Sequence, residues 1–260
     1  MADAFYLPDG RDRFVATELT RGPWDPAAQH AGPPAALLGR AVERVGDRPD
    51  LHTARVTFEI PRPVPLGAVE VAARRLRGGR SVELVEATLS AAGTTVMRAM
   101  ALRIRRAELP PPGGLAGGRR LPGPERGREA PFFPTGQQVG YHTAMEWRFL
   151  AGSFLEPGPA TVWLRMRHPL VPDEPPSPLV RVLAAADSGN GVSAALDYRD
   201  WLFVNADLTV YLHRPAVGEW VALEAATTIA AGVGLADTAI HDQQGPLGRG
   251  LQALLVDRRR

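Results

Sequence analysis

Apolar and polar positions follow the same pattern in two parts of the chain. In each part, an apolar run with helical spacing precedes four segments in which apolar and polar residues alternate as in the strands of an antiparallel sheet. The first series consists of a helix over 33–45 and strands near 52–61, 67–77, 81–91 and 95–106. The second consists of a helix over 178–187, with Ser177 as N-cap, and strands near 201–213, 219–230, 233–243 and 247–257. The pattern predicts two α+β units of the same construction.

The two series also share residues at corresponding positions. The stretches "ARVTFEIPRP" (54–63) and "ADLTVYLHRP" (206–215) match when the chain is shifted by 152 positions, and matches continue without a gap to Arg106 and Arg258. Further strands are expected before each helix, within "DRFVATEL" and "YHTAMEWRFL". A register that persists over about fifty residues indicates a duplicated domain, in which each antiparallel sheet wraps around one central helix.

The stretch between the two series differs from both in composition. Residues 108–136 are rich in Pro and Gly and lack periodic apolar positions. Such a composition is typical of an interdomain linker. We therefore predict an N-terminal domain over 1–107 and a C-terminal domain over 137–260.

Composition excludes several classes of function. All 30 basic residues are Arg, the formal net charge is +2, and the chain has no Cys. Because the Arg residues alternate with Asp and Glu, no nucleic-acid partner is expected, and without Cys there is neither a disulfide nor a thiolate site. The six His residues lack metal-ligand spacing, so we expect no metal and no other cofactor. No signal-peptide pattern and no apolar window of about 18 residues is found, which favours a soluble cytoplasmic protein over a membrane protein.

Gln252 is the first of three polar residues that stand out in the second series. The alternation over 95–106 predicts that Met100, Leu102 and Ile104 face the core, with Arg103 on the other side. The shift of 152 positions puts Gln252 where the first series has Met100. A buried amide must find hydrogen-bond partners or line a wet pocket, so Gln252 is a candidate site residue.

Asp187 and Asn205 are the other two. Asp187 lies at the end of the apolar stripe of the second helix, where burial and the negative end of the helix dipole both disfavour the ionised carboxylate, as suits a general base. The alternative is that Asp187 only caps the turn "SGNG" that follows. Asn205 falls on the strand face opposite Leu208, so a role on the core side requires a bulge or bend.

These residues lie in motifs that resemble a known family. "AAADSG" (184–189), "VNADLTVYLHRP" (204–215) and "GRGLQALLVDR" (248–258) are similar to the motifs of the double-hotdog thioesterases, in particular the acyl-CoA thioesterase II group. "QHAGPPAALLGRA" and "VTFEIPRP" match the amino-terminal hotdog more loosely. The resemblance covers most of the chain and implies a tandem double hotdog whose two sheets join edge to edge.

The resemblance also implies an activity, the hydrolysis of acyl-CoA or acyl-carrier-protein thioesters. In the family an Asp, a Thr or Ser, and a Gln hold and activate the hydrolytic water, and these positions are Asp187, Asn205 and Gln252 here. Asp187 would take a proton from water as it attacks the thioester carbonyl, and no acyl-enzyme forms. The N-terminus of the first helix would supply substrate contacts and oxyanion donors, from His30, Gly32 and Ala35.

Other functions are weighed against this one. Because Asn205 replaces the family's hydroxyl, the chain could be a degenerate hotdog that binds acyl thioesters or a carrier protein without hydrolysis. A serine hydrolase is disfavoured, since "GVSAA" lacks the strand-to-helix context of a nucleophile elbow. The matching Arg62 and Arg214 are expected to serve the fold.

Several properties of the binding site stay open from the sequence alone. The acyl chain length depends on which large aromatic residues point inward, and the candidates are Trp147, Phe149, Phe154 and Trp163. The choice between coenzyme A and a carrier protein is also open. So is homo-oligomerisation, although similar proteins are commonly dimers or tetramers.

Overall fold

The structure, a computed structural model, describes residues 3–46, 48–109 and 118–259. In the first half the elements are β1 (Tyr6–Pro8), β2 (Arg13–Ala16), η1 (Glu18–Thr20), α1 (Gly32–Glu43), β3 (Leu51–Glu59), β4 (Gly67–Arg77), β5 (Val82–Ala91) and β6 (Thr94–Arg105). In the second they are η2 (Pro124–Arg126), α2 (Tyr141–Ala144), β7 (Met145–Ser153), β8 (Glu156–Met166), α3 (Pro178–Ala186), α4 (Gly189–Val192), β9 (Trp201–Asn205), β10 (Asp207–Leu212), β11 (Val221–Ala230), β12 (Val233–Asp242) and β13 (Gly245–Arg258).

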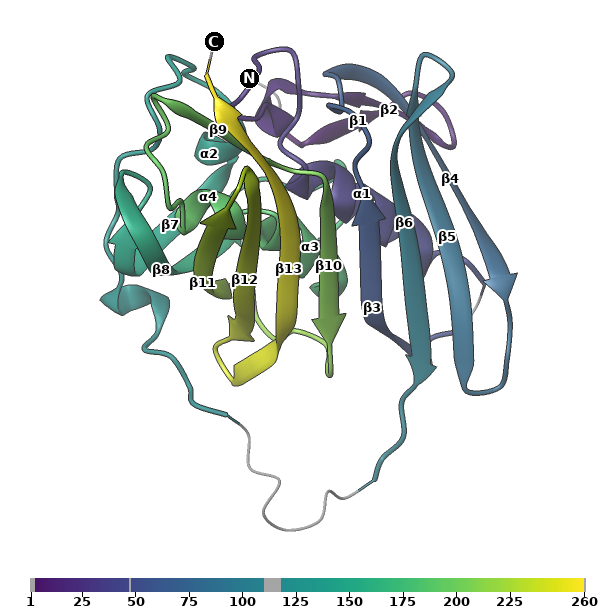
Figure 1. Cartoon of the computed structure of the whole chain (residues 1–260). Helices are drawn as coiled ribbons and strands as arrows, with labels where there is room; N and C mark the ends of the chain where they lie inside the picture. Colours follow the sequence, from purple (N-terminus) through teal and green to yellow (C-terminus); the bar gives the residue numbers. More distant parts are fainter. Residues whose placement is uncertain (1–2, 47, 110–117, 260) are drawn as a thin grey trace.

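The described strands form one continuous antiparallel sheet rather than two separate ones. Its order is β1-β2-β4-β5-β6-β3-β10-β13-β12-β11-β8-β7, with β9 added on β13, so the second half repeats the first in reverse (Figure 1). The halves join where β3 pairs with β10, and there Thr57 lies opposite Thr209. These two residues are 152 positions apart, the shift found in the sequence. Each is therefore paired with its own counterpart, as expected at a two-fold axis, and their hydroxyls are 3.2 Å apart.

The repeat register changes by one residue at the hairpin β4–β5, which corresponds to β11–β12 in the second half. Arg74 pairs with Glu86 and Ala226 pairs with Asp237, so the partners are 12 residues apart in the first half (86 − 74) and 11 in the second (237 − 226). The extra residue is absorbed by a bulge in β4 after Arg75. From β5 onward, counterparts are therefore 151 positions apart, and Gln252 corresponds to Ala101 rather than to Met100.

The sequence-based prediction of which face of β6 is buried is wrong. Ala99 and Ala101 face the core, and so does Arg103, which is 3% exposed, whereas Ile104 is 40% exposed. Arg103 is tolerated inside because its guanidinium donates to the carbonyls of Val42 and Val45 and lies 3.3 Å from the buried Glu83 carboxylate. Because an Arg in an ion pair occupies a buried position, the alternation of apolar and polar residues assigned the buried side of β6 to the wrong face.

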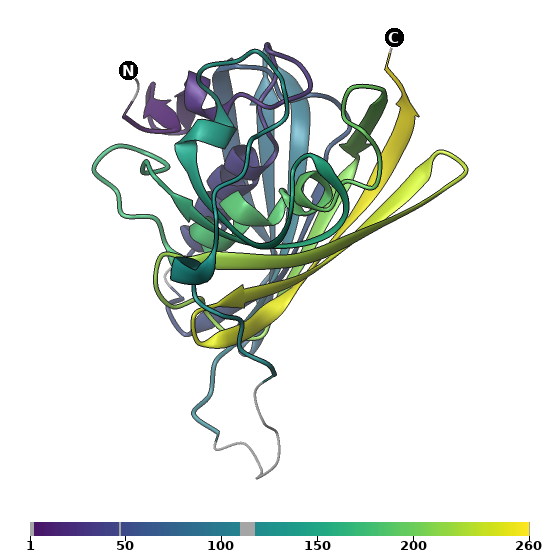
Figure 2. The same ribbon diagram turned by 90° about the vertical axis from the view of Figure 1, so that its left-hand side faces the viewer.

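The core lies between the curved sheet and the two longer helices, α1 and α3 (Figure 2). Apolar residues at helical spacing bury α3 on nearly all sides, since it packs against α1 as well as against β8 and β11. The helices approach closely at Gly39, where a Cβ atom would lie 2.4 Å from the Leu183 side chain. A larger residue there would displace the Leu183 side chain from its place between the helices.

A bulge separates β9 from β10. Both strands pair with β13, but Asn205 lies opposite Leu254 and Thr209 opposite Leu251, so four steps along one strand match three along the other. The extra residue is Ala206, and the one-residue shift reverses the side to which preceding side chains point. The bend that a core-side role for Asn205 requires is therefore present.

The predicted linker (108–136) is described from residue 118 onward, and its part 110–117 lies outside the described residues. The described part packs on the second half of the sheet. Arg128 exchanges backbone hydrogen bonds with Phe149, and the Trp163 indole donates to the Pro122 carbonyl. The domain boundaries stay a prediction. Among the described helices, none has the length and apolar character to span a bilayer.

Candidate active site

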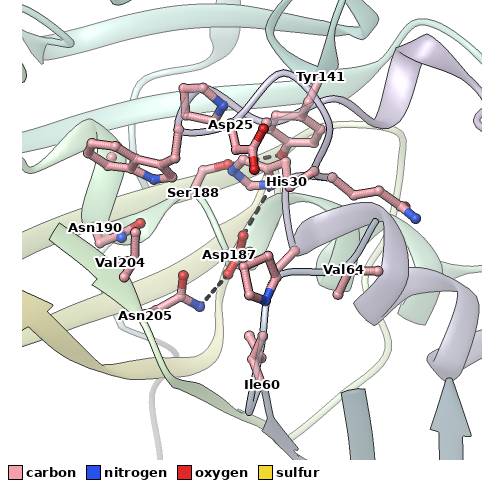
Figure 3. Close-up of a pocket in the computed structure, with 18 of the residues that line it drawn as sticks. Asp25, His30, Ile60, Val64, Tyr141, Asp187, Ser188, Asn190, Val204 and Asn205 are labelled. Atoms are coloured by element: carbon pink, nitrogen blue, oxygen red, sulfur yellow. Dashed lines mark hydrogen bonds and ion pairs between the residues drawn. The ribbon is translucent and has the colours of Figure 1, made fainter. Parts of the chain in front are cut away.

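Asp187 follows the last residue of α3 and points into the protein (Figure 3). Its side chain is 4% exposed, and three residues from distant parts of the chain surround the carboxylate. Asn205 donates to Oδ1 at 2.8 Å, Gln252 donates to Oδ1 at 3.3 Å, and His30 Nδ1 lies 3.1 Å from Oδ2. The carboxylate does not cap the "SGNG" stretch, which instead forms the short helix α4.

Gln252 of β13 connects the ends of two helices. Its Nε2 donates to the backbone carbonyl of Asp187 at 3.1 Å, and its Oε1 accepts the N–H of Asn190 at 3.1 Å. Both ends of this buried amide are thereby satisfied. α4 comes this close because residue 189 is Gly: a Cβ there would be 2.9 Å from the Gln252 oxygen. Gln252 consequently fixes the position of Asp187.

Asn205 reaches the site from the end of β9. Its Nδ2 donates to Asp187 and also to the carbonyl of Asp207 at 3.2 Å, which uses both amide hydrogens. Its Oδ1 makes no hydrogen bond with a residue that the structure describes. Asn205 also lines a cavity that opens beside Asp187. The amide therefore presents an acceptor to the cavity beside the carboxylate.

His30 precedes α1 and completes the group around Asp187. Its Nδ1 is 3.0 Å from the Gly32 N–H and 3.1 Å from Asp187 Oδ2, and one nitrogen cannot accept from the amide and donate to the carboxylate at once. A single proton therefore decides whether Nδ1 donates to Asp187 or accepts from Gly32. Burial lowers the pKa of His30, and the nearby Asp187 carboxylate partly offsets that effect. The imidazole is therefore neutral near pH 7.

Tyr141 of α2 supports this arrangement. Its ring stacks on the His30 imidazole with centroids 3.8 Å apart and an interplanar angle of 8°. Its hydroxyl donates to the Ala184 carbonyl at 2.6 Å and accepts from Ser188 at 2.9 Å. Burial raises the pKa of Tyr141, so the hydroxyl stays protonated. Tyr141 thus holds the plane of the imidazole and ties it to the end of α3.

A cavity of about 380 Å³ opens beside Asp187. Most of its wall is apolar, and Asp187, His30 and Asn205 form a polar cluster within it, as in typical small-molecule sites. The aromatic residues in the wall are Trp24, Phe132, Phe133, Tyr141, Trp147 and Phe154. Of the four aromatic candidates for the acyl pocket, Trp147 and Phe154 line the cavity, whereas Phe149 and Trp163 are buried elsewhere.

The other predicted substrate contacts lie outside the lining. His30 lines the cavity, but Gly32 and Ala35 do not. The Ala35 amide donates to the Ala31 carbonyl at 2.9 Å, and the Gly32 N–H faces His30 Nδ1 at 3.0 Å, which accepts from it when that nitrogen carries no proton. Ala31 does line the cavity, and its N–H has no hydrogen-bond partner among the described residues. Among the three amides of Ala31, Gly32 and Ala35, that of Ala31 thus has no partner in the part of the chain that the structure describes.

Several residues of the site escaped the sequence patterns. Tyr141 and Phe133 carry no motif of their own and reach the cavity from separate segments, and Ser188 lies inside the motif "AAADSG" but was not singled out. Phe133 lies in the stretch predicted as a linker, where the paired "FF" within Pro-rich text was the one available signal. Of the described residues, no cluster of three or more His, Cys, Asp or Glu is arranged to hold a metal.

The opposite end of the helix pair carries a second cavity of about 290 Å³. Its wall includes Glu43, the last residue of α1, and Thr53 of β3. Thr53 is 152 positions before Asn205 and precedes a bulge at the corresponding place, because Thr53 pairs with Arg103 and Arg55 pairs with Leu102. This cavity is therefore the counterpart of the first.

The counterpart lacks the arrangement found around Asp187. Where the second half has Gln252, the first has Ala101, which offers no side-chain hydrogen bond. Glu43 accepts a hydrogen bond from the Ser177 hydroxyl, at the start of α3, at 2.6 Å. Arg103 lines this cavity, and its guanidinium donates a hydrogen bond to the Val42 carbonyl near the end of α1. The convergent set of carboxylate, two amides and imidazole thus occurs at one end of the helix pair.

Comparison with known proteins places this site in a family. The sequence model of the acyl-CoA thioesterase C-terminal domain matches residues 124–256, and that of the acyl-CoA thioesterase N-terminal domain matches residues 20–104. The chain belongs to the acyl-CoA thioesterase family, whose members are acyl-thioester hydrolases. The comparison with curated protein sequences gives no match.

Solved structures agree on the fold. A Thermobifida fusca protein provisionally named thioesterase II superposes with a TM-score of 0.77 at 18% identity, over 98% of this chain and 96% of that one. A hot dog fold protein of unknown function from Alicyclobacillus acidocaldarius gives 0.73 at 18% identity, covering 99% and 97%. The acyl-CoA thioesterase II of Mycobacterium marinum gives 0.64 at 15% identity, covering 95% and 92%. The chain therefore has the hotdog fold.

Proposed function

We propose that the protein hydrolyses acyl-CoA or other acyl-pantetheine thioesters with a water molecule activated by Asp187. On this proposal each half is one hotdog unit, and the single chain forms a pseudo-dimer with one active end. The observation that carries the proposal is the convergence of Asn205, Gln252 and His30 on one buried carboxylate beside an apolar cavity. A hydrolytic water needs such a fixed acceptor, and an acyl chain needs the apolar wall.

The hydrogen bonds suggest how the water is held. Asp187 Oδ1 already accepts from two amides, so the water would donate one hydrogen to Oδ2 and the other to Asn205 Oδ1. Asp187 takes the first proton as the water oxygen attacks the thioester carbon, and the thiolate leaves when the tetrahedral intermediate collapses. Gln252 touches Asp187 and not the water, so we assign it a positioning role.

The N-terminus of α1 faces the developing negative charge. The Ala31 N–H is the donor in the cavity wall that could stabilise the oxyanion, aided by the positive end of the helix dipole. This assignment differs from Gly32 and Ala35, the donors expected from the sequence.

Thiol release tests the proposal. Purified protein is assayed with acyl-CoA substrates from short to long chains, and the Gln252→Ala variant is assayed in parallel. We expect turnover with a chain-length optimum, and a loss of about 10-fold to 100-fold in kcat for the variant, because an oriented base loses its support. Binding of acyl-CoA with no turnover by the native protein across the whole range would support a non-hydrolytic acyl-binding protein instead.

A further inference from the structure

Arg62 and Arg214 are identical residues of the repeat, yet they have different surroundings. Arg214 is fixed by a bidentate ion pair with Asp242, at 2.6 Å and 2.7 Å, and it also donates to the Gly245 carbonyl. Asp242 is fully buried and receives two backbone N–H groups as well, from Val217 and Gln244. Arg214 therefore serves the fold, as the sequence predicted.

Arg62 has no such partner. The hairpins β5–β6 and β12–β13 carry their bulges at the same place, so the counterpart of Asp242 is Ala91, 151 positions earlier. Arg62 is exposed, lines the cavity, and makes no hydrogen bond or ion pair with any described residue. No polar contact with a described residue therefore ties Arg62 to the fold, unlike Arg214.

The position of Arg62 is restricted even though its side chain is free. It stands between Pro61 and Pro63 in the cavity wall, and proline fixes its own φ and limits the residue before it. It is the one Arg in the described lining, where the other charged side chains are Asp25 and Asp187. The Asp25 carboxylate already accepts the Ala27 N–H at 2.8 Å. A cation is thus held at the cavity wall without a protein anion to neutralise it.

The size of the cavity indicates what this cation meets. About 380 Å³ is enough for an acyl chain and the thioester, but a whole coenzyme A molecule is larger than a cavity of this size. With the thioester at Asp187, the phosphorylated end of pantetheine must leave through the exposed side of the cavity. A guanidinium binds phosphate by paired, charge-assisted hydrogen bonds.

We propose that Arg62 binds a phosphate of the phosphorylated pantetheine that carries the acyl group. This inference rests on the proposed thioesterase function and assigns part of its substrate specificity to a residue away from the reacting atoms. The phosphate can belong to coenzyme A or to the prosthetic group of a carrier protein, because both carry 4′-phosphopantetheine.

Three thioesters of the same acyl chain test this assignment, namely the acyl-CoA, the acyl-4′-phosphopantetheine and the acyl-pantetheine, which has no phosphate. In Arg62→Ala we expect KM to rise about 10-fold for the two phosphorylated substrates, and less at high salt because of screening, with kcat unchanged. KM for acyl-pantetheine should stay within about 2-fold, since no phosphate contact is lost. Arg98→Ala, at an exposed Arg on the outer face of β6, is the matched control and should change neither constant.

Each outcome separates the proposals. An increase in KM confined to acyl-CoA supports phosphate binding by Arg62 and assigns the contact to the nucleotide end. An equal change for all three substrates, or no change for any, overturns the Arg62 proposal while leaving the hydrolase intact. Failure of the native protein to cleave any of the three substrates instead overturns the proposed function.

Discussion

The two ends of the helix pair have corresponding strands and different chemistry. At the end of α3, Asp187 meets Asn205 and Gln252 beside an aromatic cavity. At the end of α1, the corresponding strand positions hold Thr53 and Ala101, and Glu43 turns to Ser177. The two halves thus present corresponding places with different side chains, and on the proposed mechanism these side chains decide which place can hold a hydrolytic water.

At the α1 end, Arg103 has a structural role. Its guanidinium binds the last carbonyls of α1 and pairs with Glu83, whose side chain is fully buried. The counterpart of Arg103, 151 positions later, is Leu254. One end thus uses buried charge to fix its helix, whereas the other leaves its polar groups available to a ligand.

The largest effect is expected when the carboxylates at the two helix ends, Asp187 and Glu43, are replaced one at a time. Asp187→Asn keeps the size of the side chain but cannot accept a proton, so kcat for thiol release should fall about 10²-fold to 10⁴-fold while acyl-CoA still binds. Glu43→Gln is the same change at the counterpart and should leave kcat unaltered. Steady-state assays of both variants measure this difference, and comparable losses in the two would mean that the ends are not functionally distinct.

Removing Arg103 should affect stability and not turnover. Arg103→Met leaves Glu83 buried with Arg75 as its remaining partner, so the free energy of unfolding should fall by about 3 kcal/mol. Denaturant unfolding measures the loss, and Arg103→Met combined with Glu83→Leu should recover much of it. If unfolding is unchanged while kcat falls, the guanidinium belongs to the catalytic machinery and the comparison is wrong.

Exchanging residues between the ends gives a smaller effect. Asn205→Thr places the counterpart's residue beside Asp187, where its hydroxyl can both donate to the carboxylate and accept from water, so activity should stay within about 10-fold. Asn205→Val, of nearly the same shape as Thr, lacks both functions and should lose about 10-fold more. Rates for the pair are compared at saturating acyl-CoA. Equal rates for the Thr and Val variants would remove the water-holding role from this position.

The smallest effect concerns pH. Burial lowers the pKa of His30, so the unfolded chain binds its proton more tightly than the folded protein does. Stability should therefore decrease as the pH falls below the ordinary histidine value of about 6.5. His52, His142 and His241 act in the same direction, so the test is the difference between the native protein and His30→Asn, measured by thermal unfolding between neutral and mildly acidic pH. Parallel curves for the two would contradict the desolvation of His30.

Local patterns predicted much of the fold. Alternation gave most strand ranges to within two residues, and the shift of 152 positions matches the pairing of Thr57 with Thr209 that the structure shows at the junction. The face of β6 was mistaken because Arg103 is buried with a charge partner. The one-residue offset at the β4 bulge was also hidden, since a gapless comparison cannot show an insertion that a bulge absorbs.

The site was predictable only where one residue broke a pattern. Asp187 was found because a carboxylate occurred at the edge of an apolar helix stripe. Gln252 was found by comparison with Met100, where a match off by one residue and a mistaken strand face cancelled each other, since its true counterpart Ala101 is buried. The contact of His30 with Asp187 depends on how α1 and α3 pack together, and the contribution of Phe133 depends on the path of a non-periodic segment. Neither follows from local spacing, because both join parts of the chain more than fifty residues away from Asp187.

One measurement tests the central claim, which is direct attack by a water that Asp187 activates. A single turnover of acyl-CoA is carried out in ¹⁸O-labelled water, and mass spectrometry is used on the released acid and on the Asp187 peptide. Direct attack predicts labelled acid, an unlabelled peptide and no acylated protein. Label in Asp187, or an acyl group trapped on the chain, would contradict it.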